Sequence, residues 1–301
     1  MSLAPLPRRP LRVVLSFIIG TTIVLSFSRL AQPVAQEVLP PVPKATMATS
    51  PEVRFLTFAP SPYTKRFDCV RAGLGIALHL KRLADENALP VKLSFVNGVP
   101  ALRNEGEARA LLRGAPVLVI GGSTWSQGSS SPLRRFFEVT GSESLWGVSA
   151  SVWATSGGSH TGGEVVATDS MRSLMGMGAQ VFTLGQKLMV FTTDERTGVP
   201  AGEFTLLDCW YMEQFAKTLL LTAHAKGEPE KAKELAQKLK LTHAYYFGHP
   251  KTNEELIPRH EEIRGLINTA ADRKASSLPS IAIRLGLSPD NLRPALPGLA
   301  E

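Results

Sequence analysis

The sequence has little cysteine and lacks the short motifs of several common enzyme classes. Two cysteines among 301 residues are too few for a disulfide-stapled small domain or for a zinc site with four thiolate ligands. Neither the Gly-x-Ser-x-Gly motif nor the P-loop motif occurs, which argues against a serine hydrolase and a nucleoside triphosphatase. The hydrophobic content of 44% and the charged content of 20% exclude an intrinsically disordered chain.

The excess of positive charge is unevenly distributed along the chain. The net charge is +7, a value that at first suggests nucleic acid or an anionic membrane as a partner. Residues 1–50 hold five basic side chains against one acidic, residues 51–225 hold 16 against 15, and residues 226–301 hold 12 against 10. Because the middle of the chain is nearly neutral, no nucleic-acid partner is expected.

The N-terminal segment, residues 1–31, has the features of a membrane anchor or a targeting segment. Three arginines between positions 8 and 12 precede sixteen uncharged residues, 13–28, which Arg29 closes. As a helix this run would span about 24 Å, and the flanking arginines would extend its reach toward the bilayer thickness of about 30 Å. We expect a single-pass anchor; a cleaved secretory signal and a mitochondrial presequence stay open, as does the choice between a mitochondrial and a secretory-pathway membrane. Residues 32–51, which are rich in proline, are expected to form an extended linker.

Residues 52–225 alternate short apolar runs with longer amphipathic ones, which is typical of a βαβ series. Strands are expected at 53–58, 91–96, 116–122, 148–155 and 179–185. Helices are expected from 67 to near 87 and at 105–113, 129–140, 163–177 and 206–225. This pattern predicts an α/β fold with a doubly wound, five-stranded parallel sheet.

Three loops rich in Ser, Thr and Gly follow the expected strands, at 59–65, 121–131 and 154–163. In an open α/β sheet, ligands bind beyond the carboxyl ends of the strands. Loops with unobstructed backbone N–H groups that open into helix N-termini suit phosphate. The three loops together predict a phosphorylated or planar ligand at this edge.

The segment 117–146 resembles the flavodoxin-like NAD(P)H:quinone oxidoreductases of the tryptophan-repressor-binding-protein family. That family has an apolar strand, a Gly-x-Pro-Thr-Arg-Phe-Gly-Asn loop, a helix with Met-Arg-x-Phe-Leu-Asp, and then Thr-Gly and Leu-Trp. Further matches are 150–164, similar to Ser-Ser-Thr-Gly-Thr-Gly-Gly-Gly-Gln-Glu, and 197–205, similar to Gly-Gly-Thr-Pro-Tyr-Gly-Ala-Thr-Thr. The residues at matching or similar places in the first segment are Gly121, Thr124, Ser130, Leu133, Arg134, Phe136, Thr140, Gly141, Leu145 and Trp146.

The resemblance implies that FMN is the cofactor, that NAD(P)H is the co-substrate and that a quinone is the electron acceptor. It implies a flavodoxin-like domain over 52–225 and a homo-oligomer. By the same resemblance, the first loop would take the FMN phosphate through Ser61, Tyr63, Thr64 and Lys65. The second would border the flavin ring through Thr124, Trp125, Ser126, Gln127 and Gly128. The third would approach the polar edge of the ring through Thr155, Ser156, Gly157 and Gly158.

The sequence departs from the family pattern at several of these positions. Thr64 and Lys65 replace a glycine and a polar residue, and Trp125 replaces an arginine. The family's histidine near the flavin aligns with Gly176 or Met177. His160 is a candidate replacement as a proton donor, and its alternative interpretation is a solvent-exposed loop residue. We therefore also consider a second function, a non-enzymatic flavodoxin-fold accessory or structural subunit of a membrane complex.

The remaining candidates are expected to be structural. Cys69 and Cys209 lie among apolar helix positions and are predicted to be buried thiols. Trp146 and Trp153 are predicted to be core residues. Residues 226–301 form a C-terminal extension with mixed-charge helices at 228–247 and at 253–275, the second interrupted at Pro258, and a loose end at 285–301. The extension could cover the sheet edge, mediate assembly or bind a partner.

Overall fold

The computed structural model describes residues 50–58, 68–125, 127–156, 162–184, 189–192, 202–241, 253–270 and 278–287. The expected membrane anchor and all but the end of the linker therefore lie outside the described residues. Within these ranges, no helix combines the length and the apolar character that crossing a bilayer requires.

A central parallel sheet organises residues 50–287. Its main strands are β1 (Glu52–Phe58), β2 (Lys92–Asn97), β3 (Val117–Trp125), β5 (Ser149–Ser156) and β6 (Gln180–Val181). They are ordered β2-β1-β3-β5-β6, and neighbouring strands along this path run parallel. The chain steps from β1 outward to β2 and then crosses back to β3, so the strand order reverses between β1 and β3. This is the flavodoxin-like order of doubly wound α/β folds.

In the part of the chain that the structure describes, the sheet has seven strands, and the prediction of five was wrong. β4 (Gly128–Ser129) pairs antiparallel with the end of β3, inside the segment expected to be a loop. Within the expected strand at 179–185, β6 pairs beside the start of β5, whereas β7 (Val190–Thr192) pairs with the end of β5. Strands of two or three residues are too short to show an alternating pattern, and for this reason periodicity could not reveal them.

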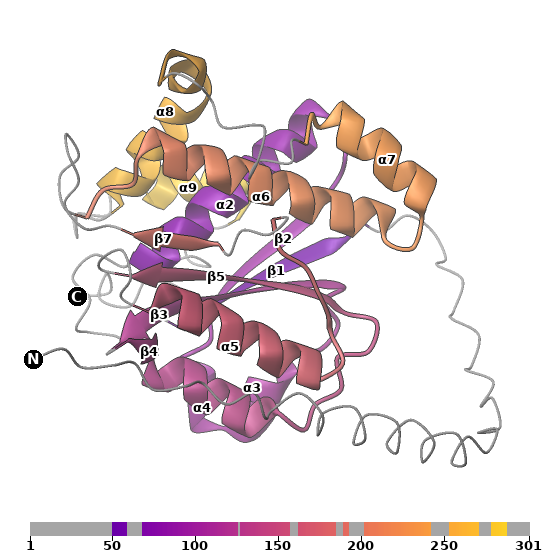
Figure 1. Cartoon of the computed structure of the whole chain (residues 1–301), viewed down its shortest axis with the longest axis vertical. Helices are drawn as coiled ribbons and strands as arrows, with labels where there is room; N and C mark the ends of the chain where they lie inside the picture. Colours follow the sequence, from indigo (N-terminus) through magenta and orange to yellow (C-terminus); the bar gives the residue numbers. More distant parts are fainter. Residues whose placement is uncertain are drawn as a thin grey trace, which may run out of the picture. The chain divides into compact units, whose positions relative to one another are not determined.

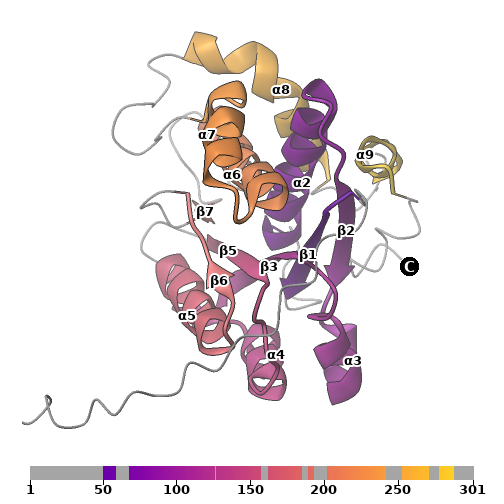
Figure 2. The ribbon, with the colours of Figure 1, turned by 90° about the vertical axis from the view of Figure 1, so that its right-hand side faces the viewer.

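The helices lie on both faces of the sheet (Figure 1 and Figure 2). On one face are α2 (Asp68–Glu86) and α6 (Leu206–Ala225). On the other are α3 (Glu105–Ala110), which follows the short 3-10 helix η1 (Pro100–Arg103), and also α4 (Ser131–Thr140) and α5 (Gly163–Gly176). The predicted helix at 206–225 is confirmed at both ends. A capping box between Thr205 and Asp208 starts it.

The strands are buried on both faces, as a parallel sheet between two helix layers requires. Along β1, Val53 and Phe55 belong to the core beneath α2 and α6, whereas Leu56 and Phe58 belong to the core beneath α4 and α5. Because successive side chains of a strand point to opposite faces, the apolar run of β1 supplies both layers.

The C-terminal extension packs onto the α2/α6 layer. It forms α7 (Pro229–Lys238), α8 (Asn253–Thr269) and α9 (Leu278–Leu285). Buried apolar side chains from all three helices, including Leu235, Ile267 and Ile281, join the same core as α2 and α6. The extension thus completes the burial of this layer.

Two predictions about the extension were wrong. The interruption at Pro258 is absent, since α8 runs continuously from Asn253 to Thr269. Pro258 lies in the second turn, where its missing N–H removes only the bond to the carbonyl of Glu254. The first residue of the expected loose end, Leu285, is the last residue of α9, a helix that the sequence analysis missed.

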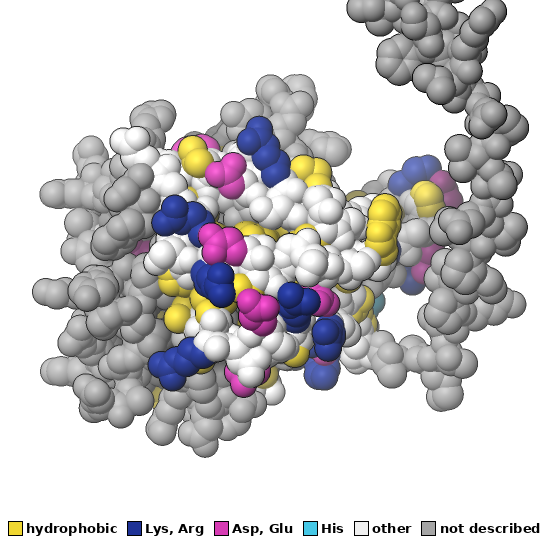
Figure 3. Space-filling model, turned by 90° about the horizontal axis from the view of Figure 1, so that it is seen from below, with side chains coloured by type: hydrophobic (Ala, Val, Ile, Leu, Met, Phe, Trp, Pro, Cys, Tyr) yellow, Lys and Arg dark blue, Asp and Glu magenta, His cyan; other side chains and the backbone are white. Residues whose placement is uncertain are grey.

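Charges of both signs alternate over the face that carries α3 and α4 (Figure 3). Arg109 and Arg113 lie 3.5 Å and 3.8 Å from the carboxylate of Glu143, and Arg135 lies 3.5 Å from Glu138. Arg109, Arg113 and Arg135 are therefore each close to an acidic side chain of the same face.

Candidate functional site

The carboxyl ends of the central strands meet at one edge of the sheet, next to the point where the strand order reverses. The register pairs Phe58 of β1 with Gly122 of β3, and Ser123 with Thr155 of β5. Ser156 of β5 is in turn paired with Thr192 of β7. Hydroxyl side chains therefore end three neighbouring strands at the place where doubly wound folds bind ligands.

On the α2 side of this edge, the hydroxyls face a buried thiol. Cys69 lies in the first turn of α2, and its thiol faces the hydroxyls of Ser123 and Thr155. Burial raises the pKa of the Cys69 thiol to about 12, and the neighbouring hydroxyls lower it only partly. At neutral pH the thiol is protonated, and a thiol is a poor nucleophile. Cys69 and Cys209 are both buried and free, so the prediction of structural thiols is confirmed.

Trp153 fixes the start of α2 against the sheet. Its side chain is 1% exposed, and its Nε1–H donates to the carbonyl oxygen of Cys69 at 2.9 Å. The ring fills the space above Gly121 of β3, where a Cβ atom would approach the ring to 2.0 Å. Only glycine at 121 admits an indole at this depth. The position of the first turn of α2 is thus set by a side chain from the middle of β5.

On the opposite side, the β3–β4 hairpin meets the start of α5. Thr124 and Trp125 pair with Ser129 and Gly128 across a two-residue turn, in which Gln127 has a positive φ of 66°. A Cβ atom on Gly162, whose φ is 90°, would lie 2.4 Å from the carbonyl oxygen of Gln127. The contact and the left-handed backbone both require glycine. The second and third predicted ligand segments therefore converge at this junction.

Thr124 supplies an unsatisfied polar atom at this junction. Its Oγ1 is buried and has no hydrogen-bond partner among the described residues. Nearby, a Cβ atom on Gly163 would lie 3.4 Å from Oγ of Ser156, so the first turn of α5 lies against the end of β5. A buried hydroxyl without a partner is costly, and a bound ligand would satisfy it.

The structure describes only some of the predicted site residues. Thr124 and Gln127 lie at the hairpin, Gly128 lies in β4, and Thr155 and Ser156 end β5. The backbone of Trp125 belongs to β3. The others lie outside the described residues: Ser61, Tyr63, Thr64, Lys65, Ser126, Gly157, Gly158 and His160.

Sequence reasoning missed part of this arrangement and misplaced one tryptophan. It gave no role at the edge to Cys69 or Gly162. Trp153 is in the core as predicted, but the prediction for Trp146 was wrong, because that side chain is 83% exposed. Trp146 lies over Gly178, where a Cβ atom would approach its ring to 3.0 Å. Because Gly178 has no side chain, the indole of Trp146 packs against its backbone while the rest of the ring stays exposed.

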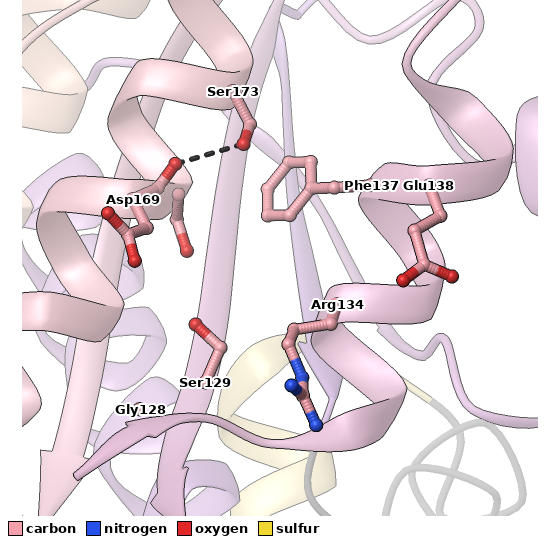
Figure 4. A pocket seen from close by; sticks show the side chains of 8 residues that line it. Gly128, Ser129, Arg134, Phe137, Glu138, Asp169 and Ser173 are labelled. Carbon is pink, nitrogen blue, oxygen red and sulfur yellow. Dashed lines mark hydrogen bonds between the residues drawn. The ribbon is translucent and has the colours of Figure 1, made fainter.

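A hollow lies between α4 and α5, beside β4 of the hairpin (Figure 4). Its volume is about 760 Å³, and its lining includes Gly128 and Ser129 of β4, Arg134 and Glu138 of α4, and Asp169 of α5. Ser173 on this wall donates to the backbone carbonyl of Asp169 at 2.9 Å. Within the described ranges, no group of three or more His, Cys, Asp or Glu side chains could hold a metal ion.

No protein-family model and no curated protein matches the sequence. Similar solved structures include an oxidoreductase from Corynebacterium diphtheriae, with 16% identity, a TM-score of 0.47 and coverage of 58% of this chain and 98% of that chain. Flavodoxin 1 from Bacillus cereus has 16% identity, a TM-score of 0.39 and coverage of 56% and 97%. A WrbA-like flavodoxin protein from Agrobacterium tumefaciens has 11% identity, a TM-score of 0.38 and coverage of 58% and 98%. The neighbours are flavodoxin-like proteins of low identity, and the fold assignment rests on the strand order of the chain itself.

Proposed function

We propose that the carboxyl edge of the sheet binds FMN and that the protein is a flavin-dependent NAD(P)H:quinone oxidoreductase. The observation that carries the proposal is the junction of the β3–β4 hairpin with Gly162, at the edge where the strand order reverses. There the hairpin, which the family resemblance assigns to FMN, meets the end of the third loop rich in Ser, Thr and Gly, at Gly162.

The described residues fit a flat, polar ligand such as FMN. Oγ1 of Thr124 is a buried hydrogen-bonding atom without a partner in the described part of the chain. α5 begins at Gly163, directly after Gly162, so the backbone N–H groups of its first turn lie at the junction with the hairpin, and N–H groups at a helix start suit an anionic ligand. Thr124 would hydrogen-bond the ligand, and the hairpin would border one side of the ring.

In this proposal, FMN supplies the redox chemistry when bound, accepting a hydride from NAD(P)H and passing two electrons to a quinone. The protein contributes the position of the ring and the polarity around it. Cys69 takes no part as a nucleophile, because burial keeps its thiol protonated. An N-terminal anchor within residues 1–31 would bring the site close to a quinone dissolved in the membrane.

A second candidate function is a flavodoxin-fold accessory or structural subunit of a membrane complex that does not bind flavin. The observation that favours it is that several hydroxyls at the edge already have partners inside the protein. The hydroxyls of Ser123 and Thr155 face the Cys69 thiol, whose pKa they lower. Oγ of Ser130 donates to the carbonyl oxygen of Phe58 at 3.1 Å. Fewer polar groups are then left for a cofactor.

The visible absorption spectrum of the purified full-length protein separates the two candidates. A flavin band near one FMN per chain, or saturable quenching of FMN fluorescence on titration, supports the oxidoreductase. If the protein stays colourless and does not quench added FMN, the oxidoreductase must be abandoned in favour of the accessory subunit.

Thr124→Val tests where FMN binds. Valine keeps the shape of threonine but removes the unsatisfied hydroxyl, so we expect weaker FMN binding, by about tenfold, without loss of folding stability. Ser173→Ala, in the hollow between α4 and α5, is the matched control and should leave FMN affinity unchanged. Equal affinity of the Thr124→Val protein and the wild type would place the flavin elsewhere.

A further inference from the structure

The end of α8 is hydrogen-bonded to the segment that leads into α6. Oδ1 of Asn268 accepts the backbone N–H of Phe204 at 2.9 Å, and Nδ2 of Asn268 donates to the carbonyl oxygen of Phe204 at 3.1 Å. One amide side chain therefore satisfies both backbone groups of one residue, as a neighbouring strand would. The C-terminal extension thereby holds the backbone of Phe204 in a fixed place.

Arg71 of α2 joins the same contact from the side of the sheet. Its guanidinium is fully buried, and it donates to the carbonyl oxygens of Gly202 at 2.6 Å and of Ile267 at 3.3 Å. It is paired with Asp68, the first residue of α2, and its Nη1 also donates to Oδ1 of Asn268 at 3.5 Å. Because Ile267 lies in the last turn of α8, the cation also faces the negative end of that helix. Three distant parts of the chain, at 68–71, 202–204 and 267–268, are thus linked at one cluster.

The cluster is connected to the proposed FMN site by two short paths. Phe204 packs edge-on against Phe191 of β7, with ring centroids 6.2 Å apart. Phe191 is the register partner of Thr155. On the other path, Arg71 lies in the same turn of α2 as Cys69, which contacts Ser123 and Thr155. A displacement of Phe204 or of the first turn of α2 would therefore reach the ends of β3 and β5.

We propose that Asn268 is a positioning residue for the ligand site. It acts through Phe204 and Arg71, so that the C-terminal extension stabilises the position of the carboxyl edge of the sheet. The proposal rests on the proposed function for the identity of the ligand, FMN. The stabilising contact itself consists of the two hydrogen bonds between Asn268 and Phe204.

A second polar contact of α8 provides a control on the same helix. Nε2 of His260 lies 2.6 Å from Oε2 of Glu213, in the middle of α6, and both side chains are 3% exposed. Arg82 and Lys217 also approach Glu213, at 3.7 Å and 3.6 Å. This contact secures α8 to α6 but involves none of the residues at 202–204. Its loss should therefore loosen α8 without moving the edge of the sheet.

The test compares Asn268→Leu, Asn268→Asp and His260→Ala in the full-length protein. Leucine has a similar size but cannot hydrogen-bond Phe204, whereas aspartate keeps the acceptor for the Phe204 N–H and for Arg71. The measurements are the hydrogen-exchange rate of the Phe204 amide, the dissociation constant for FMN and the thermal midpoint. We expect Asn268→Leu to speed exchange and to weaken FMN binding, each by about tenfold, which corresponds to about 1.4 kcal/mol. Asn268→Asp keeps the acceptor for the Phe204 N–H but loses the donor to the Phe204 carbonyl, so its exchange rate and its FMN affinity should fall between those of the wild type and Asn268→Leu. His260→Ala should lower only the thermal midpoint.

Two results would overturn the proposal. One is an Asn268→Leu protein with unchanged exchange at Phe204 and unchanged FMN affinity. The other is a His260→Ala protein that loses as much FMN affinity as Asn268→Leu, since general loosening of α8 would then explain the effect. If the wild-type protein binds no FMN, the proposed function fails on its own, and the exchange rates alone decide whether Asn268 holds the edge.

Discussion

The two faces of the sheet differ in how their helices are buried. α2 and α6 are covered on the outside by the C-terminal helices, and buried positions occur around most of their circumference. α4 and α5 have nothing comparable over them among the described residues, and their outer sides carry charged groups and the hollow lined by Arg134 and Asp169. The α2/α6 layer is therefore buried between the sheet and the C-terminal helices, whereas the outer side of the α4/α5 layer is exposed among the described residues.

This difference explains the composition of α6 and the presence of the extension. The segment 206–225 is apolar on all sides, and such a helix is stable in water only when it is enclosed. α8 and α7 supply the enclosure, with Ile267 and Leu235 fully or almost fully buried. The residues beyond 225 are thus required by the α2/α6 face, whereas the α4/α5 face needs no further cover.

The largest expected effect is at Trp153, which holds the covered face against the sheet. Trp153→Ala would remove a fully packed indole and its bond to Cys69, at a cost of about 3–5 kcal/mol in the free energy of unfolding. Trp146→Ala, at the exposed tryptophan, is the control and should change it by less than about 0.5 kcal/mol. Urea denaturation measures both. Similar losses for the two variants would contradict the burial difference described above.

The next effect tests whether the C-terminal extension contributes to the free energy of unfolding through its contacts with α2 and α6. Ile267 is fully buried and reaches α2 next to Gly75. Ile267→Ala should lower the free energy of unfolding by about 2–5 kcal/mol. Val165→Ala, on the outer side of α5 with 46% exposure, should cost far less. A single denaturation transition with a small loss at Ile267 would show that the extension is a dispensable addition.

A smaller effect is expected at Gly162, where the uncovered face meets the candidate site. Gly162→Ala forces a positive φ on alanine and a clash with Gln127, and should cost about 1–3 kcal/mol. Gly176→Ala, at the other end of α5, meets nothing within 4 Å and should be neutral or stabilising by up to about 1 kcal/mol. Thermal unfolding of the two variants gives the comparison. Equal thermal midpoints would mean that the hairpin at Gln127 can move away from residue 162 without loss of stability.

The smallest effect concerns the ion pairs that support the uncovered face. Glu52 accepts hydrogen bonds from Arg54, which also donates to two carbonyls at the end of α3, Leu111 and Arg113. Although burial raises the pKa of Glu52, its bonds to Arg54, Ser94 and Lys92 lower it below the ordinary value of 4.5.

Because the pKa of Glu52 is lower in the folded state, its contribution is present above pH 4.5 and is lost as the pH falls through the folded value. Denaturation of the wild type and Glu52→Gln from about pH 7 to about pH 3 should give curves that differ by up to about 1 kcal/mol at neutral pH and converge in acid. A constant difference across this range would show that ionisation of Glu52 is not the cause.

Much of the fold was predictable because long periodic segments carry their own signal. The helix at 206–225 has a capping pair at its start and is rich in apolar residues along its length, and both of its ends were predicted. The strand at 53–58 differs from β1 by one residue. In contrast, β4 and β7 are set by pairing with β3 and β5, over segments too short to show a period.

The candidate site was predictable as an edge of the sheet but not as a set of contacts. Loops that follow parallel strands must gather at one edge, whatever their side chains are. Two contacts depend on how α2 and α5 pack on the sheet. The hairpin at Gln127 meets Gly162, and the Cys69 thiol faces Ser123 and Thr155. Residues far apart in sequence decide such contacts.

By itself, the sequence determined an alternating α/β chain, with a nearly neutral body and its basic excess mostly in the first 50 residues. Local periodicity and composition are sufficient for these conclusions, because they depend on neighbours along the chain. Only the tertiary structure decided that the extension covers α2 and α6 and that Asn268 reaches Phe204. The bond between Asn268 and Phe204 joins residues that are 64 positions apart, and only the packing of the whole core brings them within hydrogen-bonding distance.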